Sequence, residues 1–498
     1  MNVIHIAPEL TGYSPDLDDA SSRADLPTTV AKLAGSQSDQ RHDVTVISVL
    51  PTPMQPPFQL ARRLTPARCT IHDQELEFAV YEGSLGHSHA RVLLLSMDPR
   101  PEVHLDDHLV ALPKDVERQR DWTTRFACAV LDLVDWMGLD ADLVHLHGEA
   151  AAMALCPFDA QKVVSIYDPQ REAVFDAASF LEALNLPVLE QPTASQAPTA
   201  AQRALKRATL VLLPSHGSRF QLKLTRRRMA LKAALAEHPS VHAVLGGIDH
   251  GVWSPETAPG LAQKFSADDL SGKKDCRHRL QSLAGLAPRD DVMLAAADLG
   301  QRPDDGADHI EAAAQAIIDR DVQLIIRRPK GAPSTAELDA LAAEYPERIS
   351  IMDADRLDLQ TMLAGSDAVL SPAHWAPWGR IAMLAMAFGA VPIVRSTGGL
   401  DDLVVDWDSH TRTGGGFKYR AEDPMELVGT VLRAVQVFGD KADWALMAKR
   451  NMRALDDWAL TASRIEEFYH EVLPQKSQHE HIDEPGQPDE PEFSTSNA

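Results

Sequence analysis

Short apolar runs that alternate with helical stretches constrain the fold of this chain more than any other feature. NVIHIAP at residues 2–8 is typical of a buried strand, LPTTVAKLAG at 26–35 of a helix, and HDVTVISVL at 42–50 of a second strand. Further strand-like runs lie at 90–97, 141–147, 162–168 and 208–215. Because parallel strands need long crossover connections, usually helices, this order predicts an α/β fold with parallel strands and helices on both faces.

The same pattern begins again in the second half of the chain. VHAVLGGIDHGVWSP at 241–255 opens this series. Its strand-like runs lie at 291–299, 322–329, 348–354, 367–372 and 390–396. A chain of 498 residues is too long for one hydrophobic core. We therefore expect two Rossmann-like domains, residues 1–240 and 241–472, that face each other across a cleft, with ligands at the carboxyl ends of the strands.

Two segments stand outside this pattern. Residues 186–202 are rich in Pro, Ala and Thr and are expected to form a loop. The segment 473–498 is polar, acidic and contains several prolines, a composition typical of a disordered tail.

Charge and cysteine content exclude several classes of protein. The net charge of −24 disfavours nucleic acid or an anionic membrane as a partner, but not a neutral polysaccharide. The four cysteines lie far apart in no CxxC pattern, so neither a disulfide framework nor a zinc site is indicated. No basic signal-peptide region is apparent, and no apolar run approaches about 18 residues. The expected location is the cytoplasm.

Residues 245–286 and 389–406 carry a family resemblance. The first segment has a GID turn, a Trp-Ser-Pro step, an FS pair followed by GK, and an LQ–GL helix, and the second reads GAVPIVRSTGGLDDLVVD. Both resemble bacterial glycogen synthases and plant starch synthases, in order, over roughly residues 1–470. The resemblance implies the GT-B fold, a nucleotide-sugar donor such as ADP-glucose held mainly by the second domain, and an α-glucan acceptor such as glycogen. It further implies retaining transfer without a metal or other cofactor, and a helix around 456–472 that packs on the first domain.

In the second domain the resemblance points to a phosphate-binding turn. Thr397, Gly398, Gly399 and Leu400 follow a predicted strand and precede a helix, so their N–H groups could reach a donor phosphate. An ordinary strand–turn–helix connection is the alternative. The loop WAPWGR keeps Gly379 of the family's FEPCGL and is followed by a predicted helix that ends at Gly389.

In the first domain two matched positions are retained. HLHGEA matches the family's HxHDWH in its two histidines, and the second, His147, takes the role of the residue that approaches the sugar. A strand-end histidine bonded to the backbone is the alternative, and a metal site would lack a third ligand. DASSRAD at 19–25 aligns with the family's KTGGLGD loop; Asp25 persists, but Asp19 replaces the lysine and no lysine precedes Lys32.

Three further positions have lost the residues that the chemistry needs. The family's SRLxxQKG segment supplies an arginine and a lysine that hold the phosphates, whereas this chain has Asp298 and Asp305 there. Ala376 replaces the glutamate of FEPCGL. Losing two preorganised cations costs roughly 6 kcal/mol of transition-state stabilisation. Arg302, Arg327 or Arg328 could replace them, although exposed surface arginines are the simpler interpretation.

Two functional hypotheses follow. The chain is either an α-1,4-glucan synthase that works with substituted residues, or a non-catalytic relative that binds glucan, nucleotide sugar or an active synthase. The four substitutions at one cleft favour the second.

Overall fold

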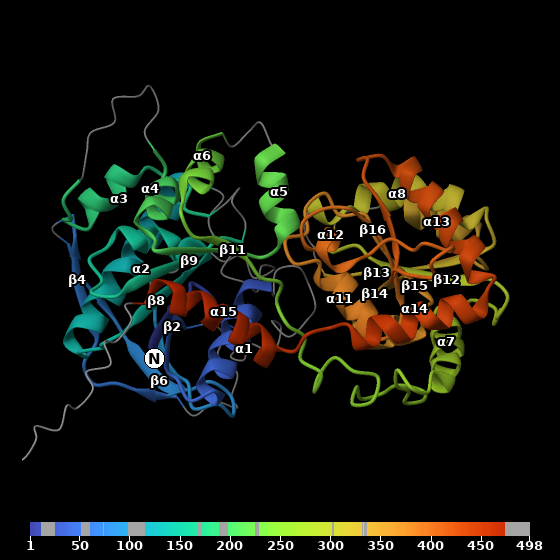
Figure 1. The fold of residues 1–498 in the computed structure, drawn as a ribbon, viewed down its shortest axis with the longest axis horizontal. Coiled ribbons are helices and arrows are strands. Elements are labelled where there is room, and N and C mark those ends of the chain that lie inside the picture. The colour runs from blue at the N-terminus through green and yellow to red at the C-terminus, as the bar shows by residue number, and fades with distance from the viewer. Residues whose placement is uncertain are drawn as a thin grey trace, which may run out of the picture.

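The computed structural model describes residues 1–10, 25–50, 60–72, 74–97, 115–167, 172–188, 198–224, 229–300, 303–330, 332 and 336–473. Within these residues the strands form a nine-stranded sheet, a six-stranded sheet and one separate hairpin. Figure 1 shows the two large sheets in two bodies side by side, each covered by helices. The predicted α/β architecture of two Rossmann-like domains is confirmed. None of the helices in the described ranges is long and apolar enough to cross a membrane.

The first sheet has the order β11-β10-β9-β8-β1-β2-β7-β6-β3. Its parallel strands are β1 (Asn2–Ile6), β2 (Asp43–Val49), β7 (Arg91–Leu95), β8 (Leu143–His147), β9 (Gln161–Ser165), β10 (Leu210–Leu213) and β11 (Val241–Ala243). At one edge, β6 (Val80–Ser84) and β3 (Ala61–Arg62) are antiparallel, and β4 (Ala67–Ile71) pairs with β5 (Gln74–Phe78) as a hairpin. The sequence analysis did not predict the strands at this edge, because they are short, polar and partly exposed.

The helices of the first domain are α1 (Asp25–Asp39), α2 (Val116–Trp136), η2 (Gly148–Leu155), α3 (Ala177–Ala183), α4 (Ala200–Arg207), α5 (His216–Leu224) and α6 (Met229–Glu237). Helix α4 overlaps the loop expected at 186–202 only in residues 200–202, and residues 189–197 of that expected loop lie outside the described residues. It begins with a capping box, because the Thr199 side chain accepts from the Gln202 N–H and the Gln202 side chain accepts from the Thr199 N–H.

The second sheet, β14-β13-β12-β15-β16-β17, is parallel throughout. Its strands are β12 (Met293–Asp298), β13 (Val322–Arg328), β14 (Ile349–Asp353), β15 (Ala368–Ser371), β16 (Val391–Arg395) and β17 (Phe417–Tyr419). The first five coincide with the predicted apolar runs. The sheet begins at β12 and not at residue 241, because β11 pairs with β10 in the first sheet.

The helices of this domain are α7 (Ser271–Leu283), η4 (Pro303–Asp305), α8 (Ala307–Ile318), α9 (Ala336–Glu344), α10 (Leu359–Gly365), α11 (Arg380–Ala387), α12 (Gly399–Leu403), α13 (Pro424–Phe438) and α14 (Lys441–Arg453). Alternate residues of β12 enter two separate cores, one with α8 and α13 and the other with α7, α10 and α11. Gly389 lies just beyond α11 at φ +64°, as its predicted role at the helix end requires.

Lys273 explains the GK motif as a structural feature. Its Nζ donates to the carbonyls of Phe388 (2.8 Å) and Ala364 (3.1 Å), at the ends of α11 and α10. Burial lowers the pKa of this amine to about 8. The GK motif, which carried part of the resemblance, therefore joins α7 to the ends of α10 and α11 within the second domain.

Helix α15 (Trp458–Val472) returns to the first domain, as the resemblance implied. Figure 1 shows it beside α1. The Tyr469 hydroxyl lies 2.6 Å from Nδ1 of His145, and Oε1 of Glu466 lies 2.8 Å from Nε2 of His42. The chain thus crosses between the domains twice, and the outgoing and returning segments touch where Ile248 N–H donates to the Asp456 carbonyl (2.9 Å). Residues 474–498, the expected disordered tail, lie outside the described residues.

Candidate functional site

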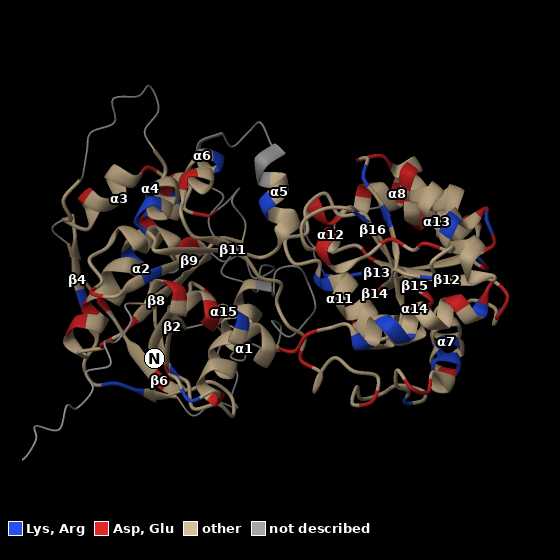
Figure 2. Ribbon diagram, viewed as in Figure 1, with Lys and Arg blue, Asp and Glu red and all other residues tan. Residues whose placement is uncertain are grey.

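Helix α5 of the first domain meets the turn before α12 of the second domain. The N–H groups of His216 and Gly217 donate to the two carboxylate oxygens of Asp402, at 2.7 and 2.8 Å. Asp402 thus supplies from the other domain the negative charge that favours a helix N-terminus. Figure 2 shows acidic residues on α12, near α5. A Cβ on Gly217 would lie 2.1 Å from the Gly398 carbonyl, so only glycine allows this approach.

The predicted phosphate-binding turn is present, and its N–H groups bond within the protein. Gly398 donates to Oε1 of Gln221 on α5 (3.2 Å), Gly399 to the Ala376 carbonyl (2.8 Å) and Leu400 to the Thr397 carbonyl (3.0 Å). The Thr397 hydroxyl accepts from Gln221 Nε2 (2.7 Å). A phosphate would have to replace these bonds, so the binding role of the turn stays a prediction.

The 376–379 loop packs directly on this turn. Gly379 has φ +66°, and a Cβ there would lie 2.8 Å from the Leu400 nitrogen. Ala376 packs beside the small apolar cluster that contains Leu400 and Val404. The site of the family's glutamate is therefore an apolar contact in this chain.

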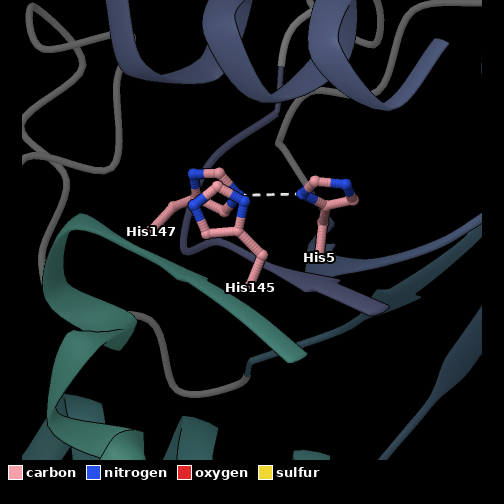
Figure 3. A group of neighbouring side chains, drawn as sticks. All are labelled: His5, His145 and His147. Atoms are coloured by element: carbon pink, nitrogen blue, oxygen red, sulfur yellow. Dashed lines mark hydrogen bonds between the residues drawn. The ribbon is translucent and has the colours of Figure 1, made fainter. Parts of the chain in front are cut away.

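His147 lies at the end of β8 and is fully buried. Its Nε2 lies 2.9 Å from Nδ1 of His5, and its Nδ1 lies 2.7 Å from the Tyr167 hydroxyl, so its partners are side chains and not the backbone. Figure 3 shows His5, His145 and His147 side by side. His5 supplies the third histidine that the sequence analysis missed. It is paired in register with His145 across β1 and β8, a neighbourhood that the parallel strand order could have suggested.

The hydrogen bonds of this histidine cluster fix the positions of its protons. Gln37 Oε1 can only accept, so His5 donates to it from Nε2 (2.8 Å) and accepts at Nδ1 from His147, which in turn accepts from the Tyr167 hydroxyl. The third ring, His145, bonds to Tyr469 and Ser165. Burial lowers the pKa of His5 to about 4 and lowers the pKa values of the other two, so all three rings are neutral at pH 7.

Two aromatic rings form a stack that begins at His147. Tyr167 stacks on it at 6° between planes, and Trp378 of the second domain stacks on Tyr167 with ring centroids 4.8 Å apart. Beside these rings and His145 lies a cavity of about 30 Å³. That volume is room for about two water molecules.

Asp298, in the predicted place of a phosphate-binding arginine, forms a buried ion pair. Its Oδ2 lies 2.6 Å from the Arg327 guanidinium on the neighbouring strand, and its Oδ1 accepts from the Gly300 N–H (2.8 Å). The Arg327 side chain is 5% exposed, which corrects the expectation of a surface arginine. Arg328 pairs with Asp353 (2.8 Å) and Asp339 (3.1 Å). Two of the three arginines considered as replacements, Arg327 and Arg328, thus bind carboxylates of this chain.

Of the other predicted positions, Asp305 has a described side chain and Asp25, Asp19 and Arg302 do not. Asp305 lies in η4 against Gly300, where a Cβ would come 2.2 Å from its Oδ2. Asp25 begins α1, and its side chain lies outside the described part, as do Asp19 and Arg302.

Comparison with known proteins gives the class and then the family. No family model matches the chain. The catalytic domain of starch synthase IV from Arabidopsis thaliana, bound to ADP and acarbose, superimposes with a TM-score of 0.79 over 95% of this chain and 99% of that chain, at 21% identity. Sucrose-phosphate synthase from Thermosynechococcus elongatus gives a TM-score of 0.58 at 15% identity, over 95% and 99%. The fold is that of a GT-B glycosyltransferase.

Sequence similarity identifies the family, whereas the solved structures identify the fold. Glycogen synthase of Anaeromyxobacter dehalogenans (strain 2CP-C) is 31% identical over 364 residues, which are 69% of this chain and 73% of the relative. Glycogen synthase of Geotalea daltonii is 25% identical over 506 residues, 96% and 100% of the two chains. The chain belongs to the glycogen synthase family.

Proposed function

We propose that this chain is a glycogen synthase homologue in which glucosyl transfer from ADP-glucose to α-1,4-glucan is attenuated or lost. Its remaining role is to bind a glucan such as glycogen, or an active synthase, as a regulatory paralogue. The Asp298–Arg327 pair is the observation that carries the proposal.

This pair removes positive charge where a diphosphate leaving group needs it. The Asp298 carboxylate and the Arg327 guanidinium, 2.6 Å apart, compensate each other's charge, so the pair offers a diphosphate no net positive charge. Two missing preorganised cations correspond to roughly 6 kcal/mol, and each 1.36 kcal/mol is a factor of about ten in rate. The rate is therefore expected to fall by about ten-thousandfold.

The contacts around His147 support the same conclusion. Trp378, which takes the place of the cysteine in FEPCGL, stacks on Tyr167, and Tyr167 covers the one histidine matched to the family's sugar-binding position. Productive sugar binding would require both rings to leave.

The first test is the incorporation of labelled glucose into glycogen from ADP-glucose or UDP-glucose. We expect no more than about a ten-thousandth of the rate of a motif-complete family member assayed in parallel. Co-sedimentation with glycogen measures the retained binding separately. Turnover comparable to that of the reference enzyme with either donor would contradict the proposal.

A rescue experiment tests whether the fold can still support catalysis once the substituted residues are restored. Asp298→Arg alone would place two guanidinium groups side by side, because Arg327 lies opposite on the next strand. We therefore combine Asp298→Arg and Arg327→Gln with Asp305→Lys and Ala376→Glu. This combination should raise turnover, and each single change should do little because such groups act as a unit.

A further inference from the structure

A second cluster of side chains lies at the carboxyl ends of the strands of the second sheet. Asp308 and His309 lie in the first turn of α8, and His374 lies in the loop after β15. One ligand atom of each residue lies within 4.8 Å of the ligand atoms of the other two. We call these three residues the Asp–His cluster. The Asp–His cluster lies in the second domain, whereas the three histidines of Figure 3 lie in the first.

His374 is oriented as metal-binding histidines are. Its Nδ1 donates to Oε1 of Glu422 (2.5 Å), and its Nε2 forms a hydrogen bond with the Asp308 carboxylate, at 2.9 and 3.1 Å from the two oxygens. A metal ion between His374 and Asp308 would replace this second bond. A carboxylate that holds one ring nitrogen fixes the tautomer and raises the basicity of the other nitrogen. Arg395 lies 3.4 Å from Glu422 and holds that carboxylate in place. The backbone N–H of His374 donates to the Asp304 carbonyl (2.8 Å), which fixes the loop that carries His374.

His309 provides the independent observation that a ligand is missing. The residue is 5% exposed, and its Nδ1 is buried without a hydrogen-bond partner among the described residues. Its ring lies 4.7 Å from the His374 ring, nearly edge-on. Buried polar nitrogens are almost always bonded, so an unpartnered one beside an imidazole and a carboxylate indicates a position for a bound ion.

The histidines of the first domain differ on this point. Each ring nitrogen of His5, His145 and His147 has a partner in the protein. That cluster is complete as a hydrogen-bonded network, whereas the Asp–His cluster is not.

We propose that Asp308, His309 and His374 bind a divalent first-row transition-metal ion, with Glu422 positioning His374. Two imidazoles and one carboxylate suit Zn²⁺, Fe²⁺ or Co²⁺ better than Mg²⁺ or Ca²⁺. The side chain of Asp308 is 64% exposed, so water can complete the coordination. The site goes beyond the proposed function, because neither glucan binding nor retaining transfer requires a metal.

The test uses the full-length protein without a histidine tag, freed of metal by a chelator. Calorimetric titration with Zn²⁺ should give one site of micromolar or tighter Kd, and Co²⁺ should produce a visible absorption band. His374→Ala and His309→Ala should each weaken binding by at least about 100-fold, and Glu422→Gln by about tenfold. The control is His410→Ala, an exposed histidine of the same domain, which should leave the affinity unchanged.

Asp308→Asn keeps the test decisive if a histidine variant misfolds, because this exposed residue can be changed without opening a core. It should weaken Zn²⁺ binding as the histidine variants do. The proposal is overturned if the wild type shows no site up to about 1 mM Zn²⁺. It is overturned equally if a site of unchanged affinity persists in the folded Asp308→Asn or His374→Ala protein.

Discussion

The three buried histidines of the first domain make the stability of the fold dependent on pH. Their rings are neutral in the folded protein, where burial lowers the pKa of His5 from 6.5 to about 4. Below about pH 6.5 the unfolded chain binds protons that the folded chain does not, so the free energy of unfolding falls on acidification. The loss is about 1.4 kcal/mol per pH unit for each such histidine, and for His5 it continues down to about pH 4.

Urea denaturation at several pH values measures this dependence. Glu149 titrates in the opposite sense, because burial raises its pKa, so the informative quantity is the difference between variants. His5→Gln should give a shallower pH slope than the wild type, whereas the exposed His410→Ala should give the same slope. Equal slopes in all three proteins would mean that His5 is already charged in the folded state.

Single residues were predictable from the sequence where the matched segment fixes their position, but their partners were not. Asp298 could be recognised as a substituted arginine. Its pairing with Arg327 depends on the register between β12 and β13, which apolar runs do not determine. His5 was missed for the same reason, because its contact with His147 spans 142 residues.

At the scale of elements, the Asp402 carboxylate of α12 joins that helix to the N-terminus of α5 in the other domain. Asp402→Ala removes two charge-assisted hydrogen bonds from the first N–H groups of α5. Loss of such a cap typically costs about 1 kcal/mol. We expect roughly fivefold faster hydrogen exchange of the amides of His216 and Gly217, because the opening free energy falls by that amount.

The neighbouring residue offers a matched control. Asp401 pairs with Lys418 of its own domain (2.8 Å) and makes no bond to α5 among the described contacts. Asp401→Ala should therefore leave exchange in α5 unchanged. If both variants changed hydrogen exchange in α5 equally, the contact with Asp402 would not be what stabilises the N-terminus of α5.

Elements with strong apolar patterns were predicted well, and those without them were missed. The buried strands of both sheets have continuous apolar runs, while β3 to β6 are short and carry exposed polar side chains. Helix α4 had a sequence signal, the Thr199–Gln202 capping box, at the end of the segment whose composition favoured a loop. Local capping was therefore a better guide than composition to the residue at which the helix begins.

At the scale of the whole molecule, the domains are held together by contacts that occupy the expected donor site. Gln221 bonds to the turn that would receive the phosphates, and Trp378 stacks on Tyr167 across the interface. Helix α15 adds a second connection, because Tyr469 bonds to His145 inside the first domain. A nucleotide would have to break protein contacts before it formed its own.

We therefore expect ADP to bind weakly. At about 1 mM it should stabilise the fold by less than about 1 kcal/mol, which corresponds to a Kd above about 0.2 mM. Thermal-shift titration measures this directly, with a motif-complete synthase as the reference. Trp378→Cys, which removes the stacked ring, should not restore affinity by itself, since the Asp298–Arg327 pair still offers the diphosphate no net positive charge. Micromolar affinity of the wild type for ADP would show that another cation binds the phosphates. Tight ADP binding by Trp378→Cys alone would show that the aromatic stack, and not the missing positive charge, weakens binding in the wild type.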